Sequence, residues 1–285
     1  MRTLLSLACV AALAGCAIIV TPDHDVQMHS VFSGDGVAGD GRVASEQRPV
    51  ANLAGLDVSG PMQVDVRVGG KPGLQVEAES NLLPMIRSDV SGDTMRIWID
   101  GKIKPSQPIR ISYSAPQLSH LRATGSGRLD VSGLNGAPLT FVKTGSGKSV
   151  LSGNVGSFDV RSTGSGTIDA LGLRSTGANA NLTGSGRIML GQVHGDQLNA
   201  HVRGSGDIEA AGAVQALNAS VHGSGDVHLS RLTAQRADLS TNGSGDISAL
   251  VKQSLVANGN GSGRITVHGN PHQRNVSGKH IDVLN

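Results

Sequence analysis

Eight copies of Gly-Ser-Gly recur along the chain at an almost constant spacing. They begin at residues 125, 145, 164, 184, 204, 223, 243 and 261, so successive copies lie 18 to 20 residues apart. A fixed period of this length is the sequence signature of a solenoid, in which each repeat forms one coil and stacks on its neighbours. A flexible Gly/Ser linker would keep neither this period nor a hydrophobic pattern between the copies.

Between the copies, apolar and polar residues alternate. Leu198, Ala200 and Val202 precede the copy at 204, and the same parity resumes after it at Ile208 and Ala210. Alternation with a period of two is typical of strands with one buried face, and no stretch shows a convincing helical period. The sequence therefore predicts an all-β fold, a single-stranded parallel β-helix with Gly-Ser-Gly coils of about 20 residues.

Both glycines of each copy fall on the inward parity, and the Ser between them faces outward. We expect the glycines at a tight corner, where φ is positive or a side chain has no room. Lys143 and Ser149 interrupt the inward apolar pattern of the second repeat. We expect a local bulge or a shift in register at these two positions.

The composition agrees with a long, narrow core. Only five of the 285 residues are Phe, Tyr or Trp, so small aliphatic side chains must fill the interior. The charges are balanced, with 24 Lys and Arg against 22 Asp and Glu. A nucleic-acid partner is not expected, because it would require a basic stripe or aromatic stacking platforms.

Residues 1–15 read as a lipoprotein signal peptide. Arg2 gives a positive start, an apolar run follows from Leu4 to Leu13, and Ala14-Gly15-Cys16 ends it. This ending resembles the lipobox of bacterial lipoproteins, which implies that Cys16 is the lipid anchor; an ordinary secretory signal with an incidental Cys is the alternative. The resemblance also implies an outer-membrane lipoprotein, facing the periplasm or the cell surface, because Ala17 replaces the Asp that retains such proteins at the inner membrane.

Cysteine usage limits the chemistry of the mature chain. The only other cysteine is Cys9, which leaves with the signal. Thiol catalysis, redox switching and cysteine zinc sites are therefore excluded. Residues 16–47 read as a flexible, glycine-rich tether. Its segment 34–41 matches G-x-G-x-x-G, but a dinucleotide site needs a strand before it and a helix after it, and the sequence predicts neither.

Residues 48–285 read as the β-helix domain. Strand-like alternation at 62–68, 74–78, 94–99 and 109–113 predicts N-terminal coils and a cap over 48–117. The Gly-Ser-Gly repeats fill 118–268, and 269–285 would close the C-terminal end. Solenoids need such atypical terminal units, because the end of the stack otherwise exposes unpaired strands.

These features together resemble a known family. The lipoprotein-like signal, the strand ending in Ile-Ser-Tyr-Ser-Ala-Pro-Gln-Leu (111–118), the repeated Gly-Ser-Gly followed by Ile or Val, and Gly269-Asn270-Pro271 are similar to the head GIN domain of putative autotransporter adhesins. The resemblance covers about 48–285. It implies a right-handed parallel β-helix and a role in adhesion, and it supplies no catalytic residues.

Two groups of residues could carry chemistry. Asp207, Asp226 and Asp246 each follow a Gly-Ser-Gly copy, so stacking would align three carboxylates in a column that could hold Ca²⁺. The alternative is a set of solvated corner carboxylates balanced by nearby Arg and Lys. His201 and His222 could lie near each other on neighbouring coils, with plain exposed histidines as the alternative.

Catalysis is not expected. No long loop interrupts the repeats to build a cleft, and eight Gly-Ser-Gly serines outside a G-x-S-x-G elbow are corners rather than nucleophiles. The sequence predicts a non-catalytic, cofactor-free protein of the cell envelope. Its partners would be the membrane, through the lipid, and a protein or glycan ligand. The alternatives are a periplasmic spacer without a dedicated ligand and a polysaccharide-processing β-helix enzyme.

Overall fold

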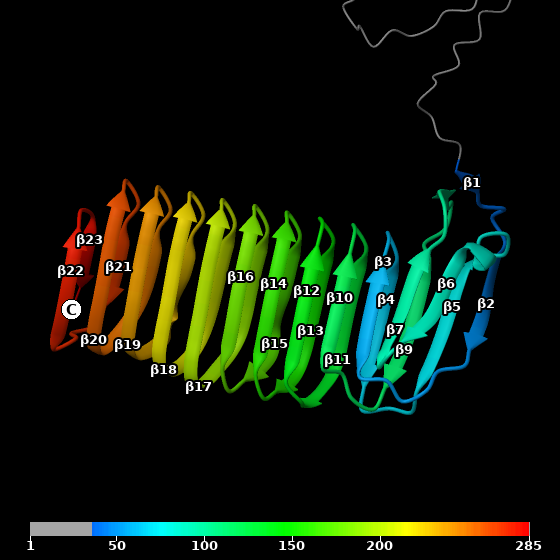
Figure 1. Cartoon of the computed structure of the whole chain (residues 1–285), viewed down its shortest axis with the longest axis horizontal. Coiled ribbons are helices and arrows are strands. Elements are labelled where there is room, and N and C mark those ends of the chain that lie inside the picture. The colour runs from blue at the N-terminus through cyan, green and yellow to red at the C-terminus, as the bar shows by residue number, and fades with distance from the viewer. Residues whose placement is uncertain (1–35, 285) are drawn as a thin grey trace, which may run out of the picture.

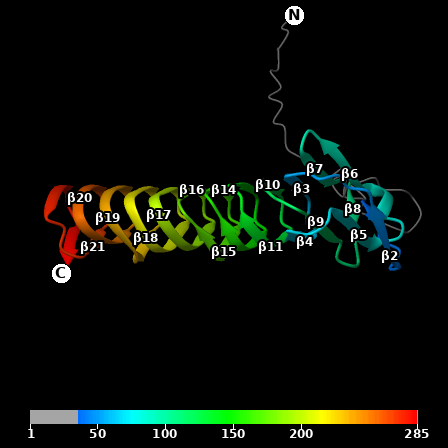
Figure 2. The same cartoon turned by 90° about the horizontal axis from the view of Figure 1, so that it is seen from below.

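The structure, a computed structural model, describes residues 36–284. The predicted signal peptide, Cys16 and residues 16–35 of the predicted tether lie outside this range. The tether prediction is wrong for residues 36–47, because this segment contributes to two strands, Val37–Ala38 and Val43–Arg48, that pair with other strands of the N-terminal part. The described chain forms a rod of stacked coils with a broader assembly of strands at its N-terminal end (Figures 1 and 2). The predicted parallel β-helix is confirmed, because every pairing between Gly-Ser-Gly coils is parallel.

The N-terminal part contains nine strands and one 3₁₀ turn, η1 (Leu83–Met85). The strands are β1 (Val37–Ala38), β2 (Val43–Arg48), β3 (Gly55–Ser59), β4 (Gln63–Val68), β5 (Gly73–Glu79), β6 (Ile86–Ser91), β7 (Thr94–Ile99), β8 (Ile103–Lys104) and β9 (Arg110–Ala115).

The repeat region continues from β10 to β23. Its strands are β10 (His120–Thr124), β11 (Arg128–Gly136), β12 (Leu139–Thr144), β13 (Lys148–Val155), β14 (Phe158–Gly164), β15 (Thr167–Ser175), β16 (Ala178–Gly184), β17 (Arg187–Gly204), β18 (Asp207–Gly223), β19 (Val227–Gly243), β20 (Ile247–Gly261), β21 (Ile265–His268), β22 (Gln273–Gly278) and β23 (Ile281–Leu284).

Each Gly-Ser-Gly copy turns the chain from one sheet of the rod into the other. The first glycine of every copy has φ between +111° and +136°, a conformation that other residues rarely adopt. The second glycine lies against the coil before it: a Cβ built on Gly206 would overlap the carbonyl oxygen of Gly186. The Ser between them is exposed in every copy, as predicted.

The coil made by β3 and β4 is out of sequence order. Its β3 pairs in parallel with both β7 and β10, and its β4 pairs with both β9 and β11. The coil therefore lies between two segments that follow it in the chain. Its own corner, Gly60-Pro61-Met62, stacks on the first Gly-Ser-Gly, and Gly60 again has a positive φ of 130°.

Antiparallel strands cover the N-terminal end of the rod. β5 pairs antiparallel with β9, β2 pairs antiparallel with β5, and β6 pairs antiparallel with β7.

Glu79, at the end of β5, is buried and accepts hydrogen bonds from the backbone N–H groups of Gly41 and Ser106, each at 2.8 Å, and from the Ser106 hydroxyl at 2.6 Å. These hydrogen bonds, that of the Ser106 hydroxyl foremost, hold the pKa of Glu79 below its usual value.

The core is a single narrow column of small side chains. Leu, Ile, Val and Ala supply nearly all of it, and three aromatic residues, Tyr113, Phe141 and Phe158, are fully buried near its N-terminal half. A cross-section of this width explains why so few aromatic residues are needed.

Lys143 and Ser149 point into this core, with 2% and 0% of their surfaces exposed. Both remain in continuous register with the coils on either side, so the bulge or register shift expected at these positions is wrong. The irregularities occur further along the same coil turns, after Val131 and after Val150. A small cavity of ≈ 20 Å³, large enough for about one water, adjoins both side chains.

Candidate ligand-binding groove

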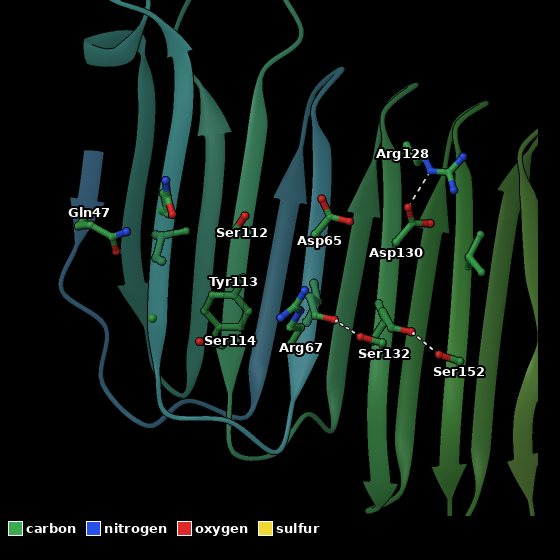
Figure 3. A pocket seen from close by; sticks show the side chains of 16 residues that line it. Gln47, Asp65, Arg67, Ser112, Tyr113, Ser114, Arg128, Asp130, Ser132 and Ser152 are labelled. Carbon is green, nitrogen blue, oxygen red and sulfur yellow. Dashed lines mark hydrogen bonds and ion pairs between the residues drawn. The ribbon is translucent and has the colours of Figure 1, made fainter. Parts of the chain in front are cut away.

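An open groove of ≈ 830 Å³ lies on the outward face of the rod, where the antiparallel cap meets the first coils (Figure 3). Strand β9 forms its floor. The antiparallel strands β5 and β2 lie on one side, and the parallel strands β4, β11 and β13 lie on the other. The groove therefore spans the boundary between cap and solenoid.

Small residues on β9 create the hollow. Ser112 lies in register between Gln75 of β5 and Asp65 of β4, and Ser114 lies between Gly73 and Arg67. Because alternate side chains of a strand point to the same face, these short hydroxyls lie in a row. Ser112 is flanked by the longer side chains of Gln75 and Asp65, whereas Ser114 has the longer Arg67 on one side and Gly73 on the other. Figure 3 shows the two serines between Gln47 on one side and Asp65 and Arg67 on the other.

The charged residues are concentrated on the solenoid side. Arg128 Nε contacts Asp130 Oδ2 at 2.7 Å, and this hydrogen bond raises the pKa of Arg128. Asp65 lies in register beside Asp130. Arg67 is exposed and makes no hydrogen bond or ion pair within residues 36–284. Both signs of charge are thus presented to a ligand, and the Arg67 guanidinium is open to a new contact.

Backbone hydrogen bonds fix the serine hydroxyls. Ser114 Oγ donates to the carbonyl of Lys71 at 2.6 Å. Ser132 and Ser152 donate to the carbonyls of Val66 and Val131, each at 3.3 Å. Each hydroxyl keeps its lone pairs for accepting a ligand's N–H or O–H, and its orientation is already set.

The aromatic residue of this region does not serve as a ligand platform. Tyr113 follows the inward parity of β9 and is only 2% exposed. Burial, with a smaller contribution from Asp93, raises its pKa to about 12. Tyr113 therefore stays neutral and faces the core, while its neighbours Ser112 and Ser114 face the ligand side.

The groove supports polar binding. Its lining supplies amide, carboxylate, guanidinium and hydroxyl groups over a surface large enough for several residues of a polymer.

Across the described range, no group of three His, Cys, Asp or Glu side chains lies close enough to hold a metal ion. In the same range, no helix has the length and hydrophobicity needed to cross a bilayer.

The three aspartates predicted as a column do follow successive corners, but their oxygens have other partners. Asp207 pairs with Arg187 at 2.8 Å. Asp226 Oδ1 accepts the backbone N–H of Asp246 at 2.8 Å, and Asp246 Oδ1 accepts that of Arg264 at 2.7 Å. The carboxylates thus hydrogen-bond from one coil to the next, which is the structural use expected of corner residues.

The predicted His pair is brought together on the opposite sheet. His201 pairs in register with Ser220, two residues before His222 on the next coil. Partial burial lowers the pKa of His201, and the charge of His222 lowers it further.

Cys16, the predicted lipid anchor, lies outside the described residues.

The groove itself was not predicted from the sequence. Its floor strand was recognised, because Ile109-Arg110-Ile111-Ser112-Tyr113 alternates clearly. The antiparallel pairing with β5 was not recognised, although the Gly69-Gly70-Lys71-Pro72-Gly73 turn precedes that strand and reverses the chain. The sequence signal for the groove was a tight turn close to a strand that carries two outward serines.

Solved structures share this fold. A "putative lipid binding protein" from Parabacteroides distasonis ATCC 8503 is 24% identical, with 87% of this chain and 97% of that chain covered and a TM-score of 0.66. A "putative adhesin" from Parabacteroides merdae ATCC 43184 is 17% identical, with coverage of 88% and 100% and a TM-score of 0.69. Another from P. distasonis is 21% identical, with coverage of 88% and 100% and a TM-score of 0.61.

No curated protein matches the chain in sequence. A family model described as "Putative auto-transporter adhesin, head GIN domain" matches residues 52–193 and 173–271. The two matches overlap and together span most of the chain, including the cap, the groove and the Gly-Ser-Gly coils. The chain belongs to this head GIN domain family.

Proposed function

We propose that this protein is a non-catalytic binding module of the cell envelope, anchored by a lipid on Cys16 to the outer membrane, and that it contacts a protein ligand through the groove. The observation that carries the proposal is the polar groove at the junction of cap and rod. It combines serine hydroxyls, three of them fixed by backbone hydrogen bonds, with side chains of both signs of charge.

A protein ligand fits this groove better than a glycan. Sugar sites usually present aromatic rings for stacking, and the groove's one aromatic residue, Tyr113, faces the core. An extended peptide carries N–H and C=O groups and side chains of both charges. Those groups complement the serines, Gln75, Asp65 and Arg67.

The family supports this assignment at a coarse level. Its description names adhesins, and similar structures carry the names adhesin and lipid-binding protein. A surface-facing rod on a lipid anchor would place the groove where an external protein could reach it.

A spacer without a ligand is the second candidate, and one observation favours it. Three asparagines form a ladder along the outer face: Asn199 Nδ2 donates to Asn179 Oδ1, and Asn218 Nδ2 donates to Asn199 Oδ1. Such ladders tie one coil to the next and serve the rod itself.

Site-specific photo-crosslinking in intact cells separates the two candidates. Benzoylphenylalanine is placed at Ser112, on the groove floor, or at Ser248, in the same outward column of the sheet near the other end of the rod. Both positions face outward, so the substitutions preserve the core.

We expect a discrete crosslinked protein from position 112 and none from position 248. Adding Arg67→Glu to the Ser112 variant should abolish that product, because it reverses the one guanidinium without a partner on β4. Equal products from both positions, or no product from position 112 in a normally abundant protein, would contradict the groove as the ligand site.

A further inference from the structure

A second hollow, of ≈ 270 Å³, lies far from the groove, over strands β16, β17 and β18. Six outward side chains form two rows of three across these coils, set by the strand register. One row holds Asn181, His201 and Ser220, and the other holds Thr183, Arg203 and His222. We call these six residues the His–Arg block.

Every residue of the His–Arg block can donate a hydrogen bond, and three can carry positive charge. His201 Nδ1 and Ser220 Oγ are 2.7 Å apart, which fixes one imidazole. Arg203 and His222 lie in register beside each other and are exposed. Within the described chain, neither makes a hydrogen bond or an ion pair.

Carboxylates are present around the block but not in it. On β14 the nearest charges are Arg161 and its partner Asp159, which are 3.6 Å apart. On β19, Ser240 pairs in register with Ser220, and Asn242 pairs with His222. Asp238 lies two residues before Ser240 and pairs with Asn218, outside the block. The lining of the hollow contains no Asp or Glu. This contrasts with the other sheet, where most Arg side chains near the corners pair with Asp.

We propose that the His–Arg block is an oxyanion-binding site that takes a sulfate or phosphate group. Arg203 supplies a planar fork of donors, and the imidazoles of His201 and His222 supply ring N–H donors. Asn181, Thr183 and Ser220 add neutral donors around the same hollow. The proposal is independent of the ligand-binding groove, which lies on the other sheet near the cap.

The expected pH dependence follows from the two imidazoles. A neutral imidazole donates one N–H, whereas an imidazolium donates two and carries a charge, so an anion should bind more tightly at pH 6 than at pH 8. By linkage, the bound anion should raise the pKa of His201. Arg161, which pairs in register with Asn181, forms an ion pair with Asp159, and Asp238 pairs in register with Asn218 outside the block.

The test follows the ring protons of each His by NMR during titration of the mature chain with sodium sulfate at pH 6 and pH 8, with ionic strength held constant by sodium chloride. We expect saturable shifts for His201 and His222 with a dissociation constant on the order of 1 mM at pH 6. Affinity should be about tenfold weaker at pH 8 and about tenfold weaker in Arg203→Ala at pH 6.

Two variants serve as matched controls. Arg236→Ala removes an exposed arginine outside the block, and His228→Ala removes a histidine that lies 4.0 Å from Asp226 on the other sheet. Both should leave sulfate binding unchanged. Arg203→Lys should retain part of the affinity, because it keeps the charge without the planar fork.

Dextran sulfate separates a free anion from a polymer-borne one. Tighter binding of dextran sulfate than of sulfate, lost in Arg203→Ala, would identify a sulfated or phosphorylated polymer as the natural source; equal affinity per sulfate would identify the free ion. Uniform shifts of all His, including His228, or sulfate affinity that Arg203→Ala leaves unchanged, would overturn the proposal.

Discussion

Lys143 places an amine inside the narrow core of the second Gly-Ser-Gly coil. It lies in register between Ala123 and Ser162, and it has no hydrogen-bond or ion-pair partner among the residues that the structure describes. The hydroxyls of Ser149 and Ser162 nearby are buried and unpaired as well. An unpaired buried cation is costly, and burial accordingly lowers the pKa of Lys143. Burial of this amine therefore costs the fold stability in this coil.

The pKa of Lys143 makes stability depend on pH. In the unfolded chain the amine keeps its ordinary pKa of about 10.4. Between the lowered pKa of the folded protein and this value, the unfolded chain binds more protons. The free energy of unfolding therefore rises with pH across that window and falls as the pH drops through it.

Lys143→Met should remove this cost. We expect it to raise the free energy of unfolding at pH 7 by about 1 kcal/mol or more and to flatten its increase towards alkaline pH. Urea denaturation at pH 7 and pH 9.5 measures both effects. Lys148→Met, at an exposed lysine 3.7 Å from Asp169, is the control and should change stability by less than about 0.5 kcal/mol. A destabilised Lys143→Met would show that the amine has a stabilising partner.

At the scale of the element, the corner is the unit that repeats. The first glycine provides the positive φ, and the second provides the close approach of consecutive coils. Ser205 donates its backbone N–H to the carbonyl of Gly184 at 2.9 Å, and Asp207 donates to Gly186 at 3.1 Å. Two carbonyls of one corner thus pair with two N–H groups of the next, so the corner transmits the register of the whole stack.

Gly206→Ala should therefore cost far more than a change to the exposed serine beside it. The new Cβ would overlap the Gly186 carbonyl, and backbone cannot move aside without breaking the ladder. We expect a loss of about 3 kcal/mol in the free energy of unfolding, against less than about 0.5 kcal/mol for Ser205→Ala. Thermal and urea unfolding of both variants provides the comparison. Similar stabilities for the two would refute the close-packed corner.

The coils could be predicted from the sequence because the spacing and the inward–outward alternation recur in eight copies. An exception in one copy therefore does not change the prediction. The strand pairing within the cap could not be predicted, because the β5–β9 pair occurs only once and is not repeated along the chain. Each of these strands alternates in a way that suits parallel and antiparallel partners equally. The inserted coil was missed for the same reason: Gly60-Pro61-Met62 occupies a Gly-Ser-Gly corner without its sequence. At Lys143 a bulge was expected, because a polar residue interrupts the inward apolar pattern. The strand instead keeps its register with both neighbouring coils and buries the lysine.

At the scale of the whole molecule, the rod is closed at one end by a cap (Figure 1). The groove lies at the boundary between the cap and the rod. A nearly constant coil length gives the repeat region regular sides, whereas at the junction the direction of strand pairing changes. A large hollow therefore appears where parallel and antiparallel pairing meet on one strand, β9. The sequence predicted the regular part and the absence of long loops, but the hollow arises from pairing that only the structure reveals.

Protease treatment of intact cells, compared with lysed cells, tests the central claim most directly. An antibody against the Gly-Ser-Gly coils follows the rod, and a known periplasmic protein reports on membrane integrity. The account predicts that coil and cap fragments are released from intact cells while the periplasmic marker survives, because the groove must face an external protein. Protection of the rod until the cells are lysed would contradict a surface-facing binding module.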